Sequence, residues 1–205
     1  MNRIVLVIEK LSMWVGHAFS WCILVLTFAV TYEVFVRYAL RDPTAWAFDV
    51  SYIMYGALFM MAGAYTLARD GHVRGDVIYR LWPPRVQAAV EFVLYLVFFF
   101  PGILALIYAG YDYASESVRW REVSINSPAG VPVYPLKIIL VVASSFMLLQ
   151  GIAEILRCIQ CLRTGEWPKR LADVEEMETV IRERKREAEA RMAAQQGGEA
   201  SGETK

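Results

Sequence analysis

Side chains that bind metals or form disulfides are scarce in this 205-residue sequence, which has three cysteines and two histidines. Three cysteines cannot build a disulfide scaffold. Acidic and basic residues are equal in number, 21 of each, so the chain lacks the large basic surface that binding to a phosphate backbone requires. No serine nucleophile motif, phosphate loop or paired catalytic carboxylates occur. The sequence therefore predicts neither a nucleic-acid-binding protein nor an enzyme, and it implies no cofactor.

Charge is also scarce over most of the chain, although not at its end. Charged residues make up 20% of the sequence and hydrophobic residues 57%, whereas an ordinary soluble domain has about 25% charged residues. Of the 42 charged residues, 18 lie in residues 166–205. The first 165 residues are too apolar for a water-soluble globule, and the last 40 are too polar to join a core. We expect a membrane domain over residues 1–165 and a charged tail over residues 166–205.

Four long uncharged runs indicate an all-α integral membrane protein with four transmembrane helices. The first run has 22 residues, which make about 33 Å of helix and cover a hydrocarbon core of about 30 Å. It has no small-residue cleavage site after it, so we interpret it as a retained helix rather than a signal peptide. With their flanking residues, the predicted spans are 11–36, 45–69, 86–111 and 135–158.

Local signals set the expected ends and shape of these helices. Asp42 and Pro43 are suited to the N-cap and first position of the second span, and Arg69 and Gly71 to its C-terminus. Pro101-Gly102 predicts a kink in the third span. The fourth run is short, 16 residues, and we expect Lys137 and Glu154 to snorkel from its two ends.

Small residues indicate where these helices approach one another. Ala64/Ala68 and Ala105/Ala109 are pairs of small residues four apart, and several glycines add further sites of close contact. Packing alone accounts for this pattern.

Lysine and arginine content predicts the orientation. The N-terminus, the loop after the second span and the segment after the fourth carry 10 such residues, whereas the two loops on the opposite side carry 5. Because positive loops stay in the cytoplasm, we expect both termini there.

The charged tail is rich in helix formers and has a narrow apolar stripe, composed of Leu171, Val174, Met177 and Ile181. It is interpreted as a solvated cytoplasmic helix, with a partner-docking helix as the alternative, and residues from Gly197 onward as disordered. Cys158 and Cys161 supply only two of the four ligands of a structural zinc, so we interpret them as reduced thiols, with acylation as an alternative.

Three ionisable residues share one depth at the outer ends of the first two spans. Glu33 and Arg37 are four residues apart on one helix face, and Asp49 lies about one turn inside the second span. Charges at membrane depth are costly and usually paired, so we expect the three to form one cluster. Such a cluster either pins two helices together or serves a coupling function.

The loop after the second span is a dense charged turn with two glycines, in which Arg69, His72, Arg74 and Asp76 are the candidate functional residues. Its alternatives are a turn or subunit contact, an anion nest, and a pH switch. One histidine without matching acidic partners makes no metal site. A bis-imidazole haem would need His17 to face a second buried histidine, and His72 is predicted to lie outside the membrane.

The order of these motifs resembles the small membrane subunit of TRAP transporters, the DctQ-like family. Glu33-Val-Phe-Val-Arg37-Tyr38 ends the first span, Trp46-Ala-Phe-Asp49 opens the second, and Gly63 to Asp76 closes it. Trp120-Arg-Glu122-Val-Ser124 then precedes a proline-rich entry into the fourth helix. The resemblance covers about residues 10–163.

This resemblance implies a tripartite uptake system in the bacterial inner membrane. Its partners would be a large permease subunit, which moves the solute with a sodium gradient and holds the sodium, and a periplasmic solute-binding protein. The small subunit would scaffold the large one among the membrane lipids and help to dock the binding protein, for uptake of an organic acid or related solute. Two alternatives remain: a self-contained homodimeric transporter that uses Glu33, and a membrane enzyme that uses His72 and Asp76.

Overall fold

Four long helical segments make up nearly all of the described structure. The computed structural model describes residues 3–69, 71, 79, 81–126, 128–168 and 184–186. The first segment comprises α1 (Arg3–Ser20), α2 (Cys22–Phe35) and the π-helical η1 (Val36–Leu40), and the second is α3 (Ala47–Ala68). The third comprises α5 (Pro84–Leu94), the π-helical η2 (Tyr95–Phe99) and α6 (Phe100–Trp120), and the fourth is α7 (Tyr134–Thr164). No strand occurs in the described residues, so the predicted all-α class is confirmed.

Each of the four segments is long and apolar enough to cross a membrane. They have 38, 22, 37 and 31 residues, so their lengths run from about 33 to about 57 Å, against about 30 Å of hydrocarbon. The three longer segments therefore tilt within a bilayer or extend beyond it.

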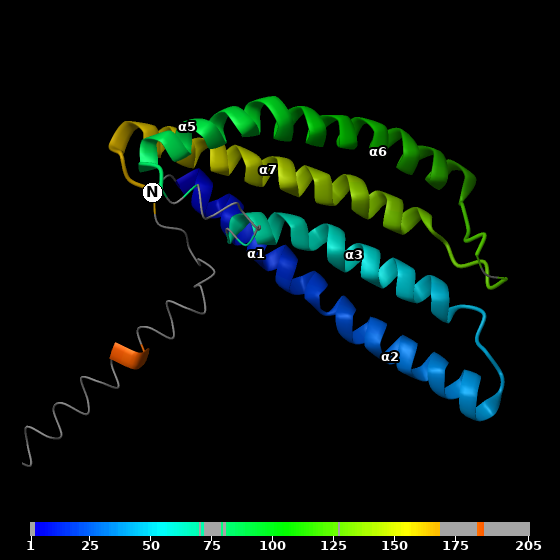
Figure 1. The fold of residues 1–205 in the computed structure, drawn as a ribbon. Coiled ribbons are helices and arrows are strands. Elements are labelled where there is room, and N and C mark those ends of the chain that lie inside the picture. Colours follow the sequence, from blue (N-terminus) through cyan, green and yellow to red (C-terminus); the bar gives the residue numbers. More distant parts are fainter. Residues whose placement is uncertain are drawn as a thin grey trace, which may run out of the picture. The chain divides into compact units, whose positions relative to one another are not determined.

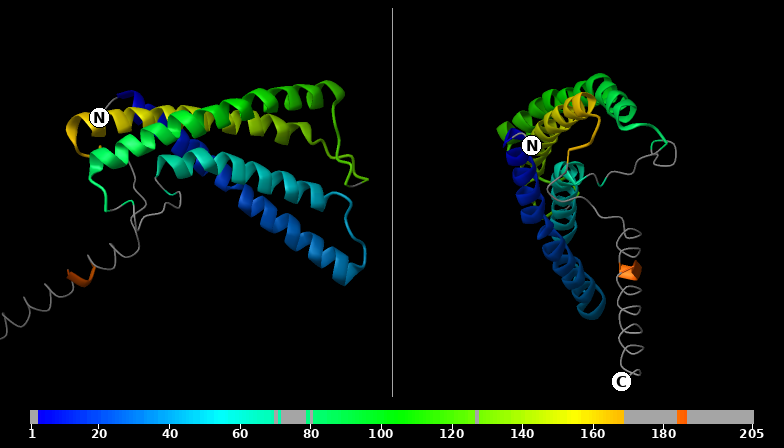
Figure 2. Two further views of the ribbon diagram at one scale, coloured as in Figure 1. Left: turned by 45° about the horizontal axis from the view of Figure 1, so that its top comes forward. Right: turned by 90° about the vertical axis from the view of Figure 1, so that its left-hand side faces the viewer.

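The helices pack as a row in which α3 and α7 are central. Within residues 1–171, α6 packs on α7, α7 packs on α3, and α3 packs on α2. Figure 1 shows this order, and Figure 2 shows the continuous α1–α2 helix running obliquely, so that α1 contacts both α3 and α7. The segments Arg3–Leu40 and Pro84–Trp120 consequently form the two edges. Of the second unit, residues 172–205, only Arg184–Arg186 are described, and they are helical.

The connecting segments lie at the two ends of this row of helices. We call these ends the loop end and the terminal end. The loop end carries the connecting segments 41–46 and 121–133, and the terminal end carries Arg3 together with the chain after Thr164. The two ends lie at opposite sides of Figure 1. Most of the polar contacts between helices gather at these ends.

The backbone hydrogen-bond pattern of the third segment changes from α-helical to π-helical next to the predicted kink. The π-helical turn Tyr95–Phe99 lies directly before Phe100-Pro101, and the α5–α6 helix is visibly curved (Figure 1). Proline has no N–H to bond the carbonyl four residues earlier, and a π-turn absorbs such a mismatch. Phe99, in this turn, packs against Gly151 of α7. A Cβ atom added to Gly151 would lie 2.3 Å from Cε1 of Phe99, so the close contact requires glycine.

The start of the second span differs from the prediction. Asp42 and Pro43 do not begin the helix; α3 begins at Ala47, after Trp46. The reason is that η1 ends at Arg41 in the left-handed conformation, φ 56°, and the backbone N–H of Thr44 turns back to Glu33. At the other end, α3 stops at Ala68 and the N–H of Gly71 donates to the carbonyl of Thr66 at 2.9 Å.

The two predicted pairs of small residues have different surroundings. Ala64 and Ala68 are buried in the row of helices, whereas Ala105 and Ala109 face outward on α6. Only the first pair is used for packing within this chain.

Candidate functional site

At the loop end, Glu33 joins the first helical segment to the connecting segment 41–46. Its Oε1 accepts hydrogen bonds from Nε of Arg37 at 2.8 Å and from Nη2 at 2.5 Å. Its Oε2 accepts from the backbone N–H of Thr44 at 3.0 Å and also from the Thr44 hydroxyl. Both oxygens of this carboxylate are therefore occupied, and together they close the connection between η1 and α3.

Asp49 lies near the start of α3 and is directed to another part of the loop end. It is buried, and Ser124 donates a 2.5 Å hydrogen bond to its Oδ1. Ser124 belongs to segment 121–133, in which Val123 and Pro132 form an antiparallel bridge. The structure thus brings Glu33 and Arg37 together and connects Asp49 with a loop that follows it by 75 residues.

Glu122 and Lys137 form a second ion pair at the same end. Nζ of Lys137 donates to Oε2 of Glu122 at 2.5 Å and lies 3.7 Å from the centre of the Tyr113 ring. Ser117 donates to the same Oε2 at 2.7 Å. The hydrogen bond from Lys137 and then that from Ser117 hold the pKa of Glu122 below its ordinary value. Glu122 is thus the point where α6, the loop and α7 meet.

The remaining predicted residues are scattered. Trp46 stacks on Tyr32 with ring centres 6.0 Å apart. Trp120 is exposed beside the Arg119 guanidinium, and Arg69 donates to the hydroxyl of Tyr65. His72, Arg74 and Asp76 lie outside the described residues, and so does the apolar stripe predicted for the tail.

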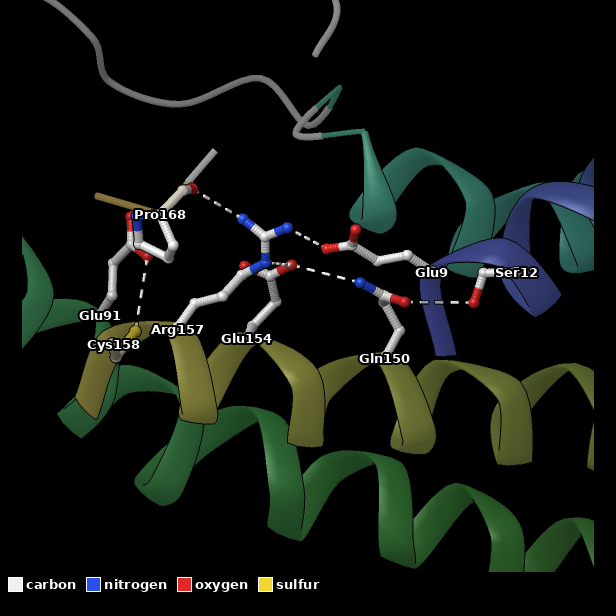
Figure 3. A network of polar contacts seen from close by, with 8 residues as sticks. All are labelled: Glu9, Ser12, Glu91, Gln150, Glu154, Arg157, Cys158 and Pro168. Atoms are coloured by element: carbon white, nitrogen blue, oxygen red, sulfur yellow. Dashed lines mark hydrogen bonds and ion pairs between the residues drawn. The ribbon is translucent and has the colours of Figure 1, made fainter. Parts of the chain in front are cut away.

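The terminal end contains a polar network that the sequence analysis did not predict (Figure 3). At its centre is Arg157 of α7, which is 2% exposed. Its Nη2 donates to Oε1 of Glu9 on α1, and Nη1 donates to the carbonyl of Pro168 at 3.1 Å. Glu9 is 1% exposed, and its Oε2 accepts no hydrogen bond from the described residues. A buried guanidinium therefore joins the first helix to the last and to the chain beyond it.

The network continues along α7 toward the middle of that helix. Oε1 of Glu154 lies 4.0 Å from Nε of Arg157 and accepts a 3.3 Å hydrogen bond from Gln150. Oε1 of Gln150 in turn accepts a 3.2 Å hydrogen bond from Ser12 of α1. Glu154 and Gln150 are fully buried, so the expectation that Glu154 snorkels to water is wrong. The carboxylate instead faces Arg157 one turn away, and α1 covers both.

Next to this network, α5 and α7 contact each other through Glu91. The hydroxyl of Tyr79 donates to Oε1 of Glu91, and Sγ of Cys158 lies 3.9 Å from Oε2. Sγ of Cys161 lies 3.5 Å from the carbonyl of Pro84. Both cysteines are fully buried, which fits packed thiols better than acylated ones.

His17 has ordinary local partners. Its Nδ1 lies 2.8 Å from the carbonyl of Met13, and its ring packs edge-on against Tyr65. Within the described part of the chain, no three histidine, cysteine or acidic side chains are placed to hold a metal ion.

These contacts define the class of the protein. It is a multi-pass helical membrane protein in which several charged side chains, among them Glu33, Glu122 and Arg157, join helices and loops to one another. The family model that describes "Tripartite ATP-independent periplasmic transporters, DctQ component" matches residues 26–161. The chain therefore belongs to the DctQ family and is a small membrane component of a TRAP transporter, a family of transport proteins. Among curated proteins, none matches the chain.

Proposed function

We propose that this chain is the scaffold of a sodium-driven uptake system for an organic acid or a related small solute. In this role it holds the large permease subunit in the bacterial inner membrane, offers the periplasmic binding protein part of its docking surface, and neither moves the solute alone nor catalyses a reaction. Sodium and solute would bind the large subunit. The observation that carries the proposal is the open row of helices, combined with membership in the DctQ family.

The two edges of the row have wide apolar faces that this chain leaves uncovered. Only 6% of the most apolar window of Arg3–Leu40 is buried, against 33% in α7. Phe28 on α2 and Tyr108 on α6 are 73% and 76% exposed. Lipid can cover both edges, but a subunit whose role is to hold a larger membrane protein needs one such face for contact.

The polar groups support a scaffold more than a transporter. A coupling carboxylate must take up and release an ion during the cycle. Glu33 already accepts hydrogen bonds from Arg37 and Thr44 on both oxygens, so a homodimeric transporter that uses Glu33 would have to break these bonds in each cycle. His72 and Asp76, on which the enzyme alternative depends, lie outside the described residues.

We also propose the orientation. The terminal end, the charged tail (166–205) and both termini face the cytoplasm, because 10 lysines and arginines flank that side and 5 flank the other. The loop end then faces the periplasm, where the binding protein is. Reporter fusions after Gly71, Asn126 and Gly198 test this, and a periplasmic reporter signal at Gly198 would contradict it.

Capture of the large subunit tests the scaffold role. The tagged chain is co-expressed with the untagged large permease subunit and purified in mild detergent, and we expect the two to co-elute. Phe28→Asn and Tyr108→Asn place the same polar group on opposite edges, so each is the control of the other. We expect one of them to weaken capture and the other to leave it unchanged. Failure of the unsubstituted chain to retain the large subunit would contradict the proposal.

A further inference from the structure

A cavity of about 300 Å³ opens at the loop end between α3, α6, α7 and segment 121–133. This volume is at the lower limit for sites that bind small molecules. Polar side chains line its mouth at the loop, among them Ser124, Glu122 and Lys137, together with apolar ones such as Val123 and Leu136. The lining residues farthest from the loop, which form its floor, are the apolar Met60 and Leu140. The lining of the cavity is therefore amphipathic, and its charged side chains all lie near the loop.

The long direction of the cavity follows the helices. Tyr52 and Met60 both line it and are eight residues apart on α3, which corresponds to about 12 Å of helix rise. Leu140 lies six residues inside α7. The mouth is thus at the level of the connecting loop, while the floor is at the depth of the hydrocarbon layer.

Glu122 and Lys137, the two charged residues at the mouth, are of opposite sign, and only some of their donor and acceptor atoms bond to described residues. Both hydrogen bonds that Glu122 accepts from described residues go to Oε2, and its side chain is 42% exposed. Lys137 has three N–H donors, of which one goes to Glu122 while another side of the ammonium group faces the Tyr113 ring. One acceptor oxygen and one donor are therefore available side by side.

We propose that this cavity binds a glycerophospholipid with an ethanolamine headgroup, taken from the adjacent leaflet. The phosphate accepts a hydrogen bond from Lys137, the ammonium group donates to Oε1 of Glu122, and part of one acyl chain lies along Met60, Leu136 and Leu140. A soluble anion or a small polar solute would leave the apolar floor uncovered. A choline headgroup has no N–H for Glu122, and a glycerol headgroup has no positive charge.

The test is native mass spectrometry of the purified full-length chain in detergent, titrated in turn with phosphatidylethanolamine, phosphatidylcholine and phosphatidylglycerol. We expect about fivefold higher retention of phosphatidylethanolamine, because a hydrogen bond between two charged groups is lost in the other complexes. Leu140→Trp fills the floor and should lower this retention about fivefold. The matched control is Ile138→Trp, which adds the same bulk two residues earlier, at an exposed position that does not line the cavity.

Glu122→Gln keeps the test decisive if Leu140→Trp does not fold. It keeps the size of the side chain and removes its charge, so it should reduce the preference for phosphatidylethanolamine over phosphatidylcholine, because a neutral amide oxygen accepts a weaker hydrogen bond from the ammonium group than a carboxylate does. Equal retention of all three lipids by the unsubstituted chain would overturn the proposal, as would equal effects of Leu140→Trp and Ile138→Trp. If the chain retains no lipid and Leu140→Trp instead blocks capture of the large subunit, a protein side chain occupies the cavity and the proposal is wrong.

Discussion

The two ends of the helix row use charge in different ways. At the terminal end, Glu9 and Arg157 are almost completely buried and come from the first and last helices, 148 residues apart. At the loop end, Arg37 is 52% exposed and pairs with Glu33 one turn away on the same helix. A buried pair that joins distant helices fixes the tertiary arrangement, whereas a partly exposed pair within one helix mainly orients a loop.

This difference suggests different roles for the two ends in the scaffold that we propose. The terminal-end network holds α1 against α7 and fixes Pro168, from which the charged tail continues. At the loop end Asp49 is buried, but the side chains of Arg37 and Glu122 are partly exposed, and Glu122 and Lys137 line an open cavity. We expect substitutions at the terminal end to affect folding and those at the loop end to affect contacts with other molecules.

The largest effect is expected for Arg157→Met. Removal of the guanidinium leaves Glu9 as a buried carboxylate without its cation, which costs about 3 to 5 kcal/mol. The melting temperature and the folded yield in detergent should both fall strongly. Arg163→Met is the control, because Arg163 is exposed near the end of the same helix and should have little effect.

A double substitution sharpens this result. Glu9→Gln combined with Arg157→Met removes both charges, so it should be less destabilising than Arg157→Met alone. If the two single effects simply add, Glu9 and Arg157 do not act as a pair, and the proposed role of the terminal end must be given up.

A smaller effect is expected for Arg37→Ala, because the Arg37 side chain is 52% exposed, so water and salt screen its interaction with Glu33. Assembly with the large subunit should weaken more than for Arg41→Ala, and the difference should shrink as the salt concentration rises. Double-mutant cycles on complex yield then test which residues are coupled. We expect coupling of Arg37 with Glu33 and of Asp49 with Ser124. Coupling between Arg37 and Asp49 would instead support the predicted three-residue cluster.

The smallest effect is the pH dependence of the Glu122–Lys137 pair. Because the pKa of Glu122 is lowered in the folded chain, the pair adds stability above the ordinary glutamate value of about 4.3. That contribution is lost as the pH falls through the lowered folded-state pKa. The melting temperature of the unsubstituted chain should therefore exceed that of Glu122→Gln at pH 7, and the difference should vanish in strong acid. A constant difference over the whole pH range would rule out ionisation as its cause.

The sequence was sufficient to predict the elements that depend on local patterns. Uncharged runs located the four helices, and Pro101 marked the place where α5–α6 changes from α to π geometry. The Glu33–Arg37 pair was predictable because residues four apart share a helix face.

The contacts between distant residues were not predictable in this way. Arg157 was counted only as a positive charge beside the membrane, and Glu154 as a residue at a helix end, since nothing in their spacing points to Glu9. One signal was present: Glu154 and Arg157 are three apart and flank an uncharged run that is short for a span. In this chain, both of these charged side chains are buried inside the protein.

Uptake of solute by proteoliposomes is the measurement that tests the scaffold role most directly. Vesicles that contain only this chain are compared with vesicles that also contain the large permease subunit, both with the binding protein and a sodium gradient supplied. We expect no sodium-dependent uptake above empty liposomes for the chain alone, and uptake when the large subunit is present. Sodium-dependent uptake by the chain alone would contradict the scaffold role.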